Sequence, residues 1–432
     1  MSMPVVSIVG RVNVGKSTLF NRIVGGRAAI VDQSPGVTRD RNIAVASWGG
    51  KSFYVVDTGG LAPGSEDPMQ ASIERQIGMA VAESDVLVLV VDAQVGIHPA
   101  DSAVADLVRR SGLPVLLVAN KIDNPGQFAL AAEFFGLGIG KPWPVSAAHG
   151  TGSGDLLDAL VALLPEAPEP EGDELRLAVV GRPNVGKSSL VNRLCGEERN
   201  IVDARPGTTR DSTDTVVEHG GRKVRIIDTA GLRRRNRDME DVEYYSVLRT
   251  WKSLDRGDVV IVMLDGQEGL THQDLRIIGR AWEGGKGVLI VVNKLDLGLA
   301  RKQWLDDVLE RFPAARWIPV SFVSALEGTG VGRLLPMVIR IGDRRGASIQ
   351  TAELNKVLRI AVAKAQPPSP GGKPLRLFYA TQVAKSPPRI AIFVNRPDLV
   401  PENYRRYLEN SLHEALSLKG VPLRISYRKR EH

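Results

Sequence analysis

The sequence of 432 residues contains one cysteine, Cys195. A single cysteine cannot form an internal disulfide, which excludes the disulfide-stabilised secreted domains and favours a reducing compartment. Cys195 ends the run 190–195, which follows a glycine-rich loop and has the pattern of a helix. We expect a small core residue rather than a redox group, because free cysteines are commonly buried.

Long apolar runs are also absent. No stretch approaches the roughly 18 residues that a membrane-spanning helix needs. The chain starts with a strand-like run, 4–9, which has neither the basic flank nor the cleavage pattern of a signal peptide. We therefore expect a cytoplasmic protein without membrane contact.

Acidic residues are scarce in one part of the chain only. The net charge is +7, but residues 345–432 hold 16 Lys and Arg against 6 Asp and Glu, a balance of +10, which leaves −3 for the remainder. A basic C-terminal part on a slightly acidic body favours contact with a polyanion. The alternative is a solvated basic surface.

The sequence repeats itself. The block Gly10–Ser17 (GRVNVGKS) recurs as Gly181–Ser188 (GRPNVGKS), 171 residues later. Further blocks recur in the same order: 35–40 and 57–60 with the same offset of 171, 120–123 with an offset of 173, and 146–147 with an offset of 178. Slowly growing offsets indicate a duplicated domain with small loop insertions.

The duplication divides the chain into four parts. We predict a first domain over residues 1–165, an acidic, proline-rich linker over 166–174, a second domain over 175–344 and a basic domain over 345–432. Prolines bar a helix in the linker and its acidic residues repel one another, so it should be semi-extended.

Each duplicated domain alternates strand-like and helical segments. Short apolar runs rich in β-branched residues are typical of strands buried on both faces of a parallel sheet. Helical patterns, for example over Ala100–Arg110, lie between them. The alternation predicts an α/β domain of three layers, with strands in the first copy over Val5–Val9, Phe53–Val56, Val86–Val91 and Val115–Ala119.

The glycine-rich blocks match the phosphate-binding loop G-x-x-x-x-G-K-[ST], and each lies between a strand-like run and an amphipathic helix, as that motif requires. Glycines let backbone N–H groups curl around phosphate oxygens, and the helix directs its positive N-terminus at the anion. Lys16 and Lys187 would meet the β- and γ-phosphates, and the hydroxyls of Ser17 and Ser188 would bind Mg²⁺. The predicted phosphate-binding residues are Gly10, Arg11, Val12, Asn13, Val14, Gly15, Lys16, Ser17 and Thr18, and Gly181, Arg182, Pro183, Asn184, Val185, Gly186, Lys187, Ser188 and Ser189.

An Asp-x-x-Gly block follows a strand-like run in each copy. Asp57 and Asp228 would hold the magnesium ion through its water shell, and the N–H groups of Gly60 and Gly231 would contact the γ-phosphate. So short a motif is informative only because of its order and spacing. The segments predicted to line the nucleotide are Asp57, Thr58, Gly59, Gly60 and Leu61, and Asp228, Thr229, Ala230, Gly231 and Leu232.

Thr38 and Thr209 each lie 22 residues after the lysine of the glycine-rich loop, in a Pro-Gly-x-Thr-Arg-Asp segment. A loop threonine that reaches Mg²⁺ only when a γ-phosphate is present forms the first half of a nucleotide switch. Because both copies match, we predict both threonines as Mg²⁺ ligands.

The Asn-Lys-x-Asp blocks select the purine. Asp123 and Asp296 can accept hydrogen bonds from the N1–H and the 2-amino group of guanine, a donor pair that adenine lacks. Each block therefore predicts GTP rather than ATP, which the glycine-rich loop alone cannot decide. The asparagine would stiffen the loop and contact N7, the lysine would lie along the ring and an alanine N–H would meet O6; these residues are Asn120, Lys121, Ser146 and Ala147, and Asn293, Lys294, Ser324 and Ala325.

With these motifs the sequence resembles the TRAFAC-type GTPases, and its tandem arrangement resembles the EngA/Der family of bacterial ribosome-assembly GTPases over nearly the whole chain. Segments 379–383 (YATQV), 392–397 (IFVNRP) and 404–410 (YRRYLEN) resemble that family's KH-like domain. The resemblance implies two P-loop GTPase domains followed by a small α+β KH-like domain.

The resemblance also implies a factor for assembly or maturation of the large ribosomal subunit, with ribosomal RNA as its partner. The GTP state would control how the domains pack and whether the subunit is bound. We expect a monomer that does not bind DNA and that hydrolyses GTP slowly to GDP and phosphate. Two rival functions stay open: a nucleotide sensor with a protein partner, and an RNA-modification enzyme, for which no further catalytic cluster appears.

Hydrolysis needs a group that the motifs do not supply. Leu61 and Leu232 occupy the place of the water-orienting glutamine of signalling GTPases. Asn13 and Asn184 match the P-loop asparagine that binds potassium in part of the superfamily, and a cation there could neutralise developing charge. We predict K⁺-stimulated hydrolysis; the alternative is a structural asparagine. The predicted catalytic residues are Asn13, Lys16, Thr38, Asp57 and Gly60, and Asn184, Lys187, Thr209, Asp228 and Gly231.

The copies differ after Asp-x-x-Gly, where 233–238 is arginine-rich and 62–65 is neutral, so the two sites should differ in role. The run 233–238 is either a solvated loop or a basic switch that touches RNA or the C-terminal domain. His98 stands where the second copy has Thr271, and we expect a surface histidine without a role.

The basic domain lacks the GXXG loop with which KH domains clamp a nucleic-acid backbone. RNA contact would then come from scattered basic side chains, including Arg405, Arg406 and 428–430; packing against the GTPase domains is the alternative. The pattern predicts helices near 352–365 and 404–418 and strands near 375–380, 390–394 and 423–427.

Overall fold

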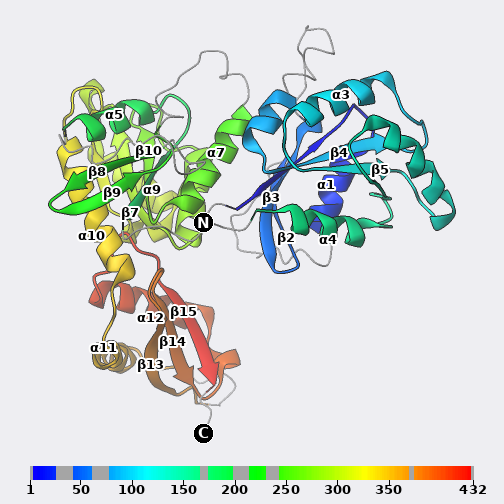
Figure 1. Cartoon of the computed structure of the whole chain (residues 1–432). Coiled ribbons are helices and arrows are strands. Elements are labelled where there is room, and N and C mark those ends of the chain that lie inside the picture. The colour runs from blue at the N-terminus through cyan, green and yellow to red at the C-terminus, as the bar shows by residue number, and fades with distance from the viewer. Residues whose placement is uncertain are drawn as a thin grey trace. The chain divides into compact units, whose positions relative to one another are not determined.

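The computed structural model describes residues 3–25, 42–60, 77–165, 174–197, 214–229, 243–368 and 374–429. By its internal contacts the chain divides into two compact units, Met1–Pro170 with Glu240–Lys252, and Glu171–Met239 with Ser253–His432. Figure 1 labels their elements. Within the described ranges, no helix has both the length and the apolar character that crossing a membrane requires.

The first unit is built on a six-stranded sheet with the order β2-β3-β1-β4-β5-β6. Its strands are β1 (Val5–Val9), β2 (Ile43–Trp48), β3 (Lys51–Asp57), β4 (Val86–Asp92), β5 (Val115–Asn120) and β6 (Pro142–Pro144). Its helices are α1 (Lys16–Gly25), α3 (Pro99–Arg110) and α4 (Ser153–Leu163), with the 3₁₀ segments η1 (Thr58–Gly60) and η2 (Pro125–Leu137).

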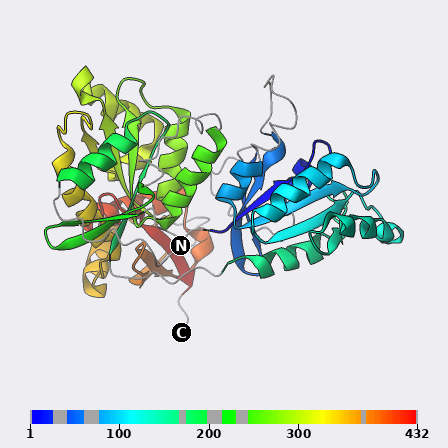
Figure 2. The ribbon, with the colours of Figure 1, turned by 45° about the horizontal axis from the view of Figure 1, so that its top comes forward.

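Helices cover both faces of this sheet, which Figure 2 shows from above. Alternate residues of β4 point to opposite faces: Val88 and Val90 join a core with α1 and α4, whereas Leu87 and Leu89 join a core with α3 and η2. Because both faces are covered, β4 is apolar throughout instead of alternating with polar residues. This confirms the three-layer α/β prediction.

One edge of the sheet departs from the expected parallel arrangement. Strand β2 pairs antiparallel with β3, whereas the other pairs in the sheet are parallel. Gly49 and Gly50 connect the two strands with φ of 54° and 78°. Positive φ at both residues is typical of the two-residue turn that matches strand twist, so the Gly-Gly pair was the available sequence signal for this hairpin.

The second unit contains a sheet of the same kind, with the order β12-β11-β10-β7-β9-β8. Its strands are β7 (Leu175–Val180), β8 (Thr215–His219), β9 (Arg222–Ile226), β10 (Val259–Asp265), β11 (Gly287–Asn293) and β12 (Val320–Phe322). The helical segments are α5 (Lys187–Glu197), α8 (His272–Glu283), α9 (Arg301–Arg311) and α10 (Leu334–Gly346), with η4 (Leu295–Leu297), η5 (Pro313–Trp317) and η6 (Val331–Arg333). Of α7 (Glu243–Arg256), residues 243–252 belong to the first unit and 253–256 to the second. Cys195 on α5 is 5% exposed among core residues, as expected.

A smaller three-stranded sheet follows, with the order β13-β14-β15. Strands β13 (Leu377–Ala384) and β14 (Arg389–Val394) are antiparallel, and β14 is parallel to β15 (Arg424–Lys429). Helices α11 (Thr351–Lys364) and α12 (Glu402–Ala415), and η8 (Pro397–Leu399), complete this part. The predicted helices and strands are thus confirmed to within a few residues.

The C-terminal part packs against the end of the second sheet at which β10 and β11 begin. The N–H of Val288 donates to the carbonyl of Gly420 (2.7 Å), and the N–H of Gly420 donates to the carbonyl of Trp317 (2.6 Å). His413 on α12 stacks on Trp282 and Trp317. Burial lowers the pKa of His413 to about 4, so the ring is neutral near pH 7 and packs as an aromatic group.

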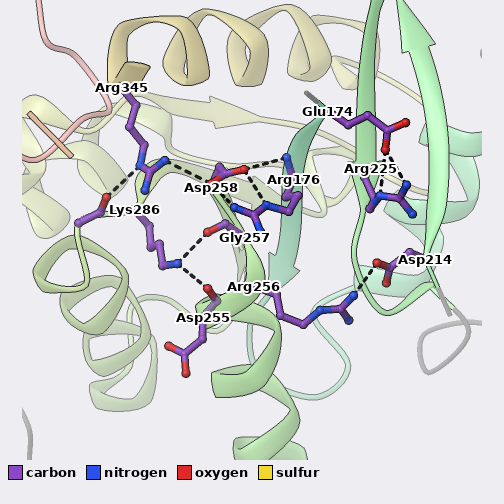
Figure 3. A network of polar contacts seen from close by, with 11 residues as sticks. Glu174, Arg176, Asp214, Arg225, Asp255, Arg256, Gly257, Asp258, Lys286 and Arg345 are labelled. Carbon is purple, nitrogen blue, oxygen red and sulfur yellow. Dashed lines mark hydrogen bonds and ion pairs between the residues drawn. The ribbon is translucent and has the colours of Figure 1, made fainter. Parts of the chain in front are cut away.

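A cluster of charged side chains stabilises the same region (Figure 3). Asp258, directly before β10, accepts hydrogen bonds from Arg176 Nε (2.9 Å) and Nη2 (3.0 Å) and from Arg345 Nη1 (3.3 Å). Arg345, in the last turn of α10, also donates to the carbonyl of Gly285 (3.1 Å). Burial by itself would raise the pKa of Asp258, but hydrogen bonds and charges from the two arginines outweigh it and hold the pKa below its ordinary value.

Lys286 lies beside this cluster. Its amine donates to the carbonyl of Asp255 (2.6 Å) in the last turn of α7 and to that of Gly257 (2.8 Å), directly after the helix. Burial lowers the pKa of Lys286 to about 8. The amine therefore satisfies carbonyl groups that a helix leaves unpaired at its C-terminus.

We predict that Asp258→Asn lowers the free energy of unfolding of the second unit by about 2 kcal/mol at pH 7, because hydrogen bonds to a charged group are lost. The pKa of Asp258 is lowered on folding, so this stabilisation is fully present above the unfolded-state pKa of about 3.9 and is lost as the pH falls through the lower folded-state pKa. Urea denaturation followed by tryptophan fluorescence at pH 7 and at about pH 2 measures both effects. Asp398→Asn, which removes a carboxylate that is 68% exposed, is the control; equal midpoints for the two variants at pH 7 would contradict the prediction.

Candidate nucleotide-binding sites

The two glycine-rich loops connect β1 to α1 and β7 to α5, and they share one backbone conformation. Gly10 and Gly15 have φ of 145° and 95°, and Gly181 and Gly186 have φ of 150° and 98°. A Cβ atom at Gly10 would lie 2.4 Å from the carbonyl oxygen of Val90, and one at Gly181 would lie 2.3 Å from that of Met263. No side chain fits there, so the loops hold a concave backbone surface of the kind that binds phosphate.

The lysine of each loop lies across this surface. Lys16 Nζ donates to the carbonyls of Gly10 (2.8 Å) and Arg11 (2.6 Å), and Lys187 Nζ donates to those of Gly181 (2.9 Å) and Arg182 (2.5 Å). Burial lowers the pKa of Lys16, and the nearby Asp57 acts in the opposite direction. Each amine is therefore held over the loop at which the sequence places phosphate.

One asparagine joins three segments in each copy. Asn120, the last residue of β5, donates from Nδ2 to the carbonyl of Val14 (2.8 Å) and accepts at Oδ1 from the N–H of Ala147 (3.0 Å). Asn293 makes the same two bonds to Val185 (2.9 Å) and Ala325 (2.9 Å). The predicted stiffening role is thus seen as direct hydrogen bonds. The N–H groups of Ala147 and Ala325 donate to these asparagines. Their contact with guanine O6 stays a prediction.

The lysine of each Asn-Lys-x-Asp block is anchored to an acid that sequence reasoning missed. Lys121 pairs with Asp92 (2.6 Å) at the end of β4, and Lys294 pairs with Asp265 (2.5 Å) at the end of β10. Burial alone would raise the pKa of Asp265, but Lys294 and backbone N–H donors hold it below its ordinary value. Both lysines have φ of 67°, a left-handed conformation that their anchoring maintains.

The two aspartates assigned to guanine are exposed. Asp123 accepts from the hydroxyl of Ser146 (2.7 Å) at one oxygen, and its side chain is 54% exposed. Asp296 is also exposed. Ser146 and Ser324 are buried and turn the following loop, since the N–H groups of His149 and Glu327 donate to their hydroxyls. Both carboxylates are therefore open to a ligand beside the loop that the asparagine holds.

The Asp-x-x-Gly blocks differ between the copies. Asp57 ends β3, is 2% exposed and accepts from the N–H of Gly59 (2.8 Å), while Thr58 donates its hydroxyl to the carbonyl of Ile8 (2.8 Å). Asp228 instead lies beyond the end of β9, at φ 57°, and its N–H donates to Asp214 (3.0 Å). The strand-end position expected for both aspartates is thus found only for Asp57.

The second copy has a further polar pair here. The hydroxyls of Thr215 and Thr229 lie 2.8 Å apart, and Asp214 pairs with Arg256 on α7 (2.6 Å). These bonds fix the backbone around Asp228 in a way that the first copy does not share. The difference agrees with the expectation, made from the loops that follow, that the two sites are not equivalent.

The arginine of each phosphate loop points away from the phosphate surface. Arg11 pairs with Asp101 (3.2 Å) on α3, and Arg182 pairs with Asp274 (3.0 Å) on α8 and Glu268 (2.8 Å). The carboxylates of Asp101 and Asp274 are fully buried. The side chains of these arginines hold the loop to the N-terminus of α3 or α8. Only their backbone groups are therefore available for the predicted phosphate contact.

The same helix starts explain His98. Its Nδ1 accepts from the N–H of Ala100 (3.1 Å), and its own N–H donates to Asp101 (3.1 Å), which caps α3. Thr271 caps α8 in the same way with Asp274. Contrary to our expectation, His98 thus has a structural role. The sequence signal was the Asp three residues later in both copies, the pattern of a capping box.

The remaining predicted residues divide into two groups. Ser17, Thr18 and Ser189 are exposed and Ser188 is half-buried at the starts of α1 and α5, and Val12, Asn13, Pro183 and Asn184 are exposed in the loops. Gly60 ends η1. Outside the described residues lie Thr38, Leu61, Thr209, Ala230, Gly231, Leu232, the run 233–238 and most of the linker 166–174.

The residues present fit a nucleotide with its magnesium ion. The loop glycines allow a close approach to neighbouring strands that any Cβ would prevent, a lysine amine lies across the loop, and a hydroxyl stands at the following helix start. Mg²⁺ in such sites is held by one or two protein oxygens together with the phosphates rather than by a cage of acids. No acidic or histidine cluster of that second kind occurs in the described part of the chain.

We predict that Asn120→Ala weakens GDP binding at the first site by at least about tenfold, because the carbonyl of Val14 and the N–H of Ala147 lose a buried partner, which costs about 1–3 kcal/mol. Titration calorimetry in a Lys187→Ala background isolates the first site. Asn124→Ala, which removes an exposed amide at the N-cap of η2 whose side chain makes no capping hydrogen bond, is the matched control. Unchanged GDP affinity in Asn120→Ala would show that the amide bridge is dispensable.

Two family models match the chain. The model described as "50S ribosome-binding GTPase" matches residues 5–121 and 176–294, and the model described as "KH-domain-like of EngA bacterial GTPase enzymes, C-terminal" matches residues 348–428. The first matches twice, once in each copy of the duplicated domain. The first model covers the larger sheets except for β6 and β12, which lie beyond the matched residues, and the second covers the three-stranded sheet up to residue 428.

Curated relatives match over the full length. GTPase Der of Moorella thermoacetica is 48% identical over 434 residues, 99% of each chain. GTPase Der of Gemmatimonas aurantiaca is 46% identical over 435 residues, 100% of each chain, and that of Desulforudis audaxviator is 49% identical over 436 residues, 100% of each chain. With this identity, two GTPase domains, a KH-like domain and the motifs for a guanine nucleotide and Mg²⁺, the chain belongs to the Der (EngA) family and is a GTPase, which hydrolyses GTP to GDP and phosphate.

Proposed function

We propose that both copies bind a guanine nucleotide with Mg²⁺ and hydrolyse GTP, and that the nucleotide state controls domain packing and binding to the large ribosomal subunit during its assembly. The observation that supports two working sites is the repeated asparagine bridge. Asn120 and Asn293 join the phosphate loop to the base loop with the same pair of hydrogen bonds. A copy that had lost its ligand would not need to keep this arrangement.

Within each site we assign roles from position. Lys16 and Lys187 neutralise the β- and γ-phosphates, Ser17 and Ser188 ligate Mg²⁺ together with Thr38 and Thr209, and Asp57 and Asp228 bind its water shell. When bound, Mg²⁺ supplies charge that stabilises the transferring phosphoryl group. Asp123 and Asp296, exposed beside the base loop, recognise guanine. Gly60 and Gly231 would donate backbone N–H groups to the γ-phosphate.

A ribosomal partner is supported by the family model and by charge. The family model that matches both GTPase domains is described as ribosome-binding. Residues 345–432 carry a balance of +10, and counterion release makes such a surface favourable for RNA. The large subunit rather than the small one is the partner that the description "50S" supports.

We predict that the chain binds two GDP molecules, whereas Lys16→Ala and Lys187→Ala each bind one. Each substitution removes the amine that lies across one phosphate loop and leaves the other copy intact. Calorimetry with GDP and with ADP measures stoichiometry and base selection. Sedimentation with purified large subunits, in GDP and in a non-hydrolysable GTP analogue, should show binding that depends on the nucleotide and weakens steeply with salt.

Three results would contradict this proposal. One guanine nucleotide per natural chain would exclude two sites, and equal affinity for ADP would exclude guanine selection. Sedimentation with large subunits that is independent of nucleotide and salt would favour the nucleotide sensor with a protein partner. Small subunits serve as the matched control particle.

We further propose that Asn13 and Asn184 hold a potassium ion beside the phosphates. Both residues are exposed in the phosphate loops at left-handed φ values of 65° and 63°. Asparagine tolerates this conformation better than most residues, which supports the structural alternative equally. The cation would neutralise negative charge that develops between the β- and γ-phosphates.

We predict that K⁺ raises the GTPase rate at least about tenfold over Na⁺ at equal ionic strength, the size expected from one well-placed charge. Asn13→Asp should change the K⁺ dependence of the first site, measured in a Lys187→Ala background. Asn184→Asp should do the same at the second site, measured in a Lys16→Ala background. Asn13→Gly, which keeps the left-handed backbone without the amide, separates the two interpretations. If Asn13→Gly retains the full K⁺ stimulation, the asparagine is structural.

A further inference from the structure

The sheet of the KH-like domain has one covered and one open face. Ile390, Ile392 and Val394 of β14 are fully buried in the core with α11 and α12. Alternate strand residues point to opposite faces, so Arg389, Ala391 and Phe393 lie on the other side. Exposed residues of β13 and β15 flank them there. Figure 1 shows the three strands side by side.

Strand register arranges this open face in three rows. The first row is Tyr379, Phe393 and Arg428, the second is Thr381, Ala391 and Ser426, and the third is Ala384, Arg389 and Arg424. The first row therefore joins two aromatic rings to a guanidinium. The second row has only small side chains, and its central residue, Ala391, is fully buried. The third row is basic.

The aromatic pair is stacked and partly open to solvent. The rings of Tyr379 and Phe393 lie 4.4 Å apart between centroids, at an interplanar angle of 14°. Tyr379 is 39% exposed on the edge strand. The two rings are therefore stacked face to face with nearly parallel planes, and an outer face of such a pair is a rigid platform on which a flat ligand can stack.

Three arginines lie on the same face, Arg428 in the row of the two rings and Arg389 and Arg424 at the other end. Arg389, Arg424 and Arg428 are exposed, and Arg424 also donates to the carbonyl of Glu283 on α8. With a rise of about 3.3 Å per residue, Arg424 and Arg428 lie roughly 13 Å apart along β15. The face thus combines stacking groups with separated positive charges, the combination that binds single-stranded nucleic acid.

We propose that this sheet face, with Tyr379, Phe393, Arg389, Arg424 and Arg428, binds single-stranded RNA, of which an unpaired base stacks on the outer face of the ring pair, at Tyr379, while the arginines contact phosphates. The proposal rests on the proposed ribosomal function and specifies where this domain would meet RNA. It replaces the missing GXXG loop by the sheet surface itself. An RNA duplex fits poorly, because its bases are paired and cannot lie on the rings.

The test uses the full chain and two fluorescein-labelled probes, an oligouridylate and an RNA duplex of equal length, followed by fluorescence anisotropy. Tyr379→Ala should weaken oligouridylate binding about tenfold, since stacking contributes about 1–3 kcal/mol per base. Binding to the duplex should not change. Tyr379→Phe, which keeps the ring, should bind the single strand like the natural chain.

Matched variants separate stacking and charge from general effects. Phe135→Ala removes a ring that is 58% exposed in the first unit and should leave binding unchanged. Arg428→Gln should reduce the slope of log affinity against log salt by about 0.7 for the single strand. Arg359→Gln, the same charge change on exposed α11, should not. Thermal unfolding and the GTPase rate confirm that each variant is folded.

Two outcomes would overturn the proposal. If Tyr379→Ala binds the oligouridylate as tightly as the natural chain does, the stacking platform is excluded. If that variant binds the oligouridylate normally but loses large subunits in sedimentation, the face contacts protein instead. If Tyr379→Ala binds both the oligouridylate and large subunits like the natural chain, the proposed RNA face is excluded but the proposed ribosomal function is not. The failure of one proposal can therefore be distinguished from the failure of the other.

Discussion

The hydrogen bonds of one asparagine side chain hold each nucleotide site together. The phosphate loop and the base loop are more than 100 residues apart in sequence, and the amide of Asn120 or Asn293 bonds to both. The close approach also explains the second loop glycine. A Cβ at Gly15 would lie 2.2 Å from Asn120 Nδ2, and one at Gly186 would lie 2.3 Å from Asn293 Nδ2. Glycine, amide and loop conformation therefore depend on one another.

The second unit uses opposite ends of one sheet for different purposes. The nucleotide motifs follow the carboxyl ends of its parallel strands, where α/β proteins commonly bind ligands. The KH-like domain packs at the other end, through Gly420, His413 and the arginines around Asp258. Strand β10 has seven residues, so about 23 Å of sheet separates the two ends. The KH-like domain is thus attached without covering the nucleotide motifs.

The duplicated GTPase domains have kept their scaffolding more strictly than their switch region. The paired anchors, Arg11 with Asp101 and Arg182 with Asp274, are the same in both copies. Asp57 and Asp228, in contrast, differ in backbone conformation and partners. The two copies thus share the contacts that position the phosphate loop and differ in those around the Asp-x-x-Gly aspartate.

The sequence by itself determined the duplication, the α/β class, the order of the motifs and the choice of guanine, because these depend on residue types at short, fixed spacings. Even the boundaries of β14 and α11 were close, since their apolar periods are regular. The antiparallel edge of β2 and the capping role of His98 had local signals, Gly49-Gly50 and Asp101, which were overlooked. Only the tertiary structure showed that Asp92, Asp101 and Asp265 anchor the site, because their partners are distant in sequence. It also decided that Tyr379, Phe393 and Arg428 share one open row. Such juxtapositions come from strand pairing between distant segments, and no local pattern encodes which residue will stand opposite which.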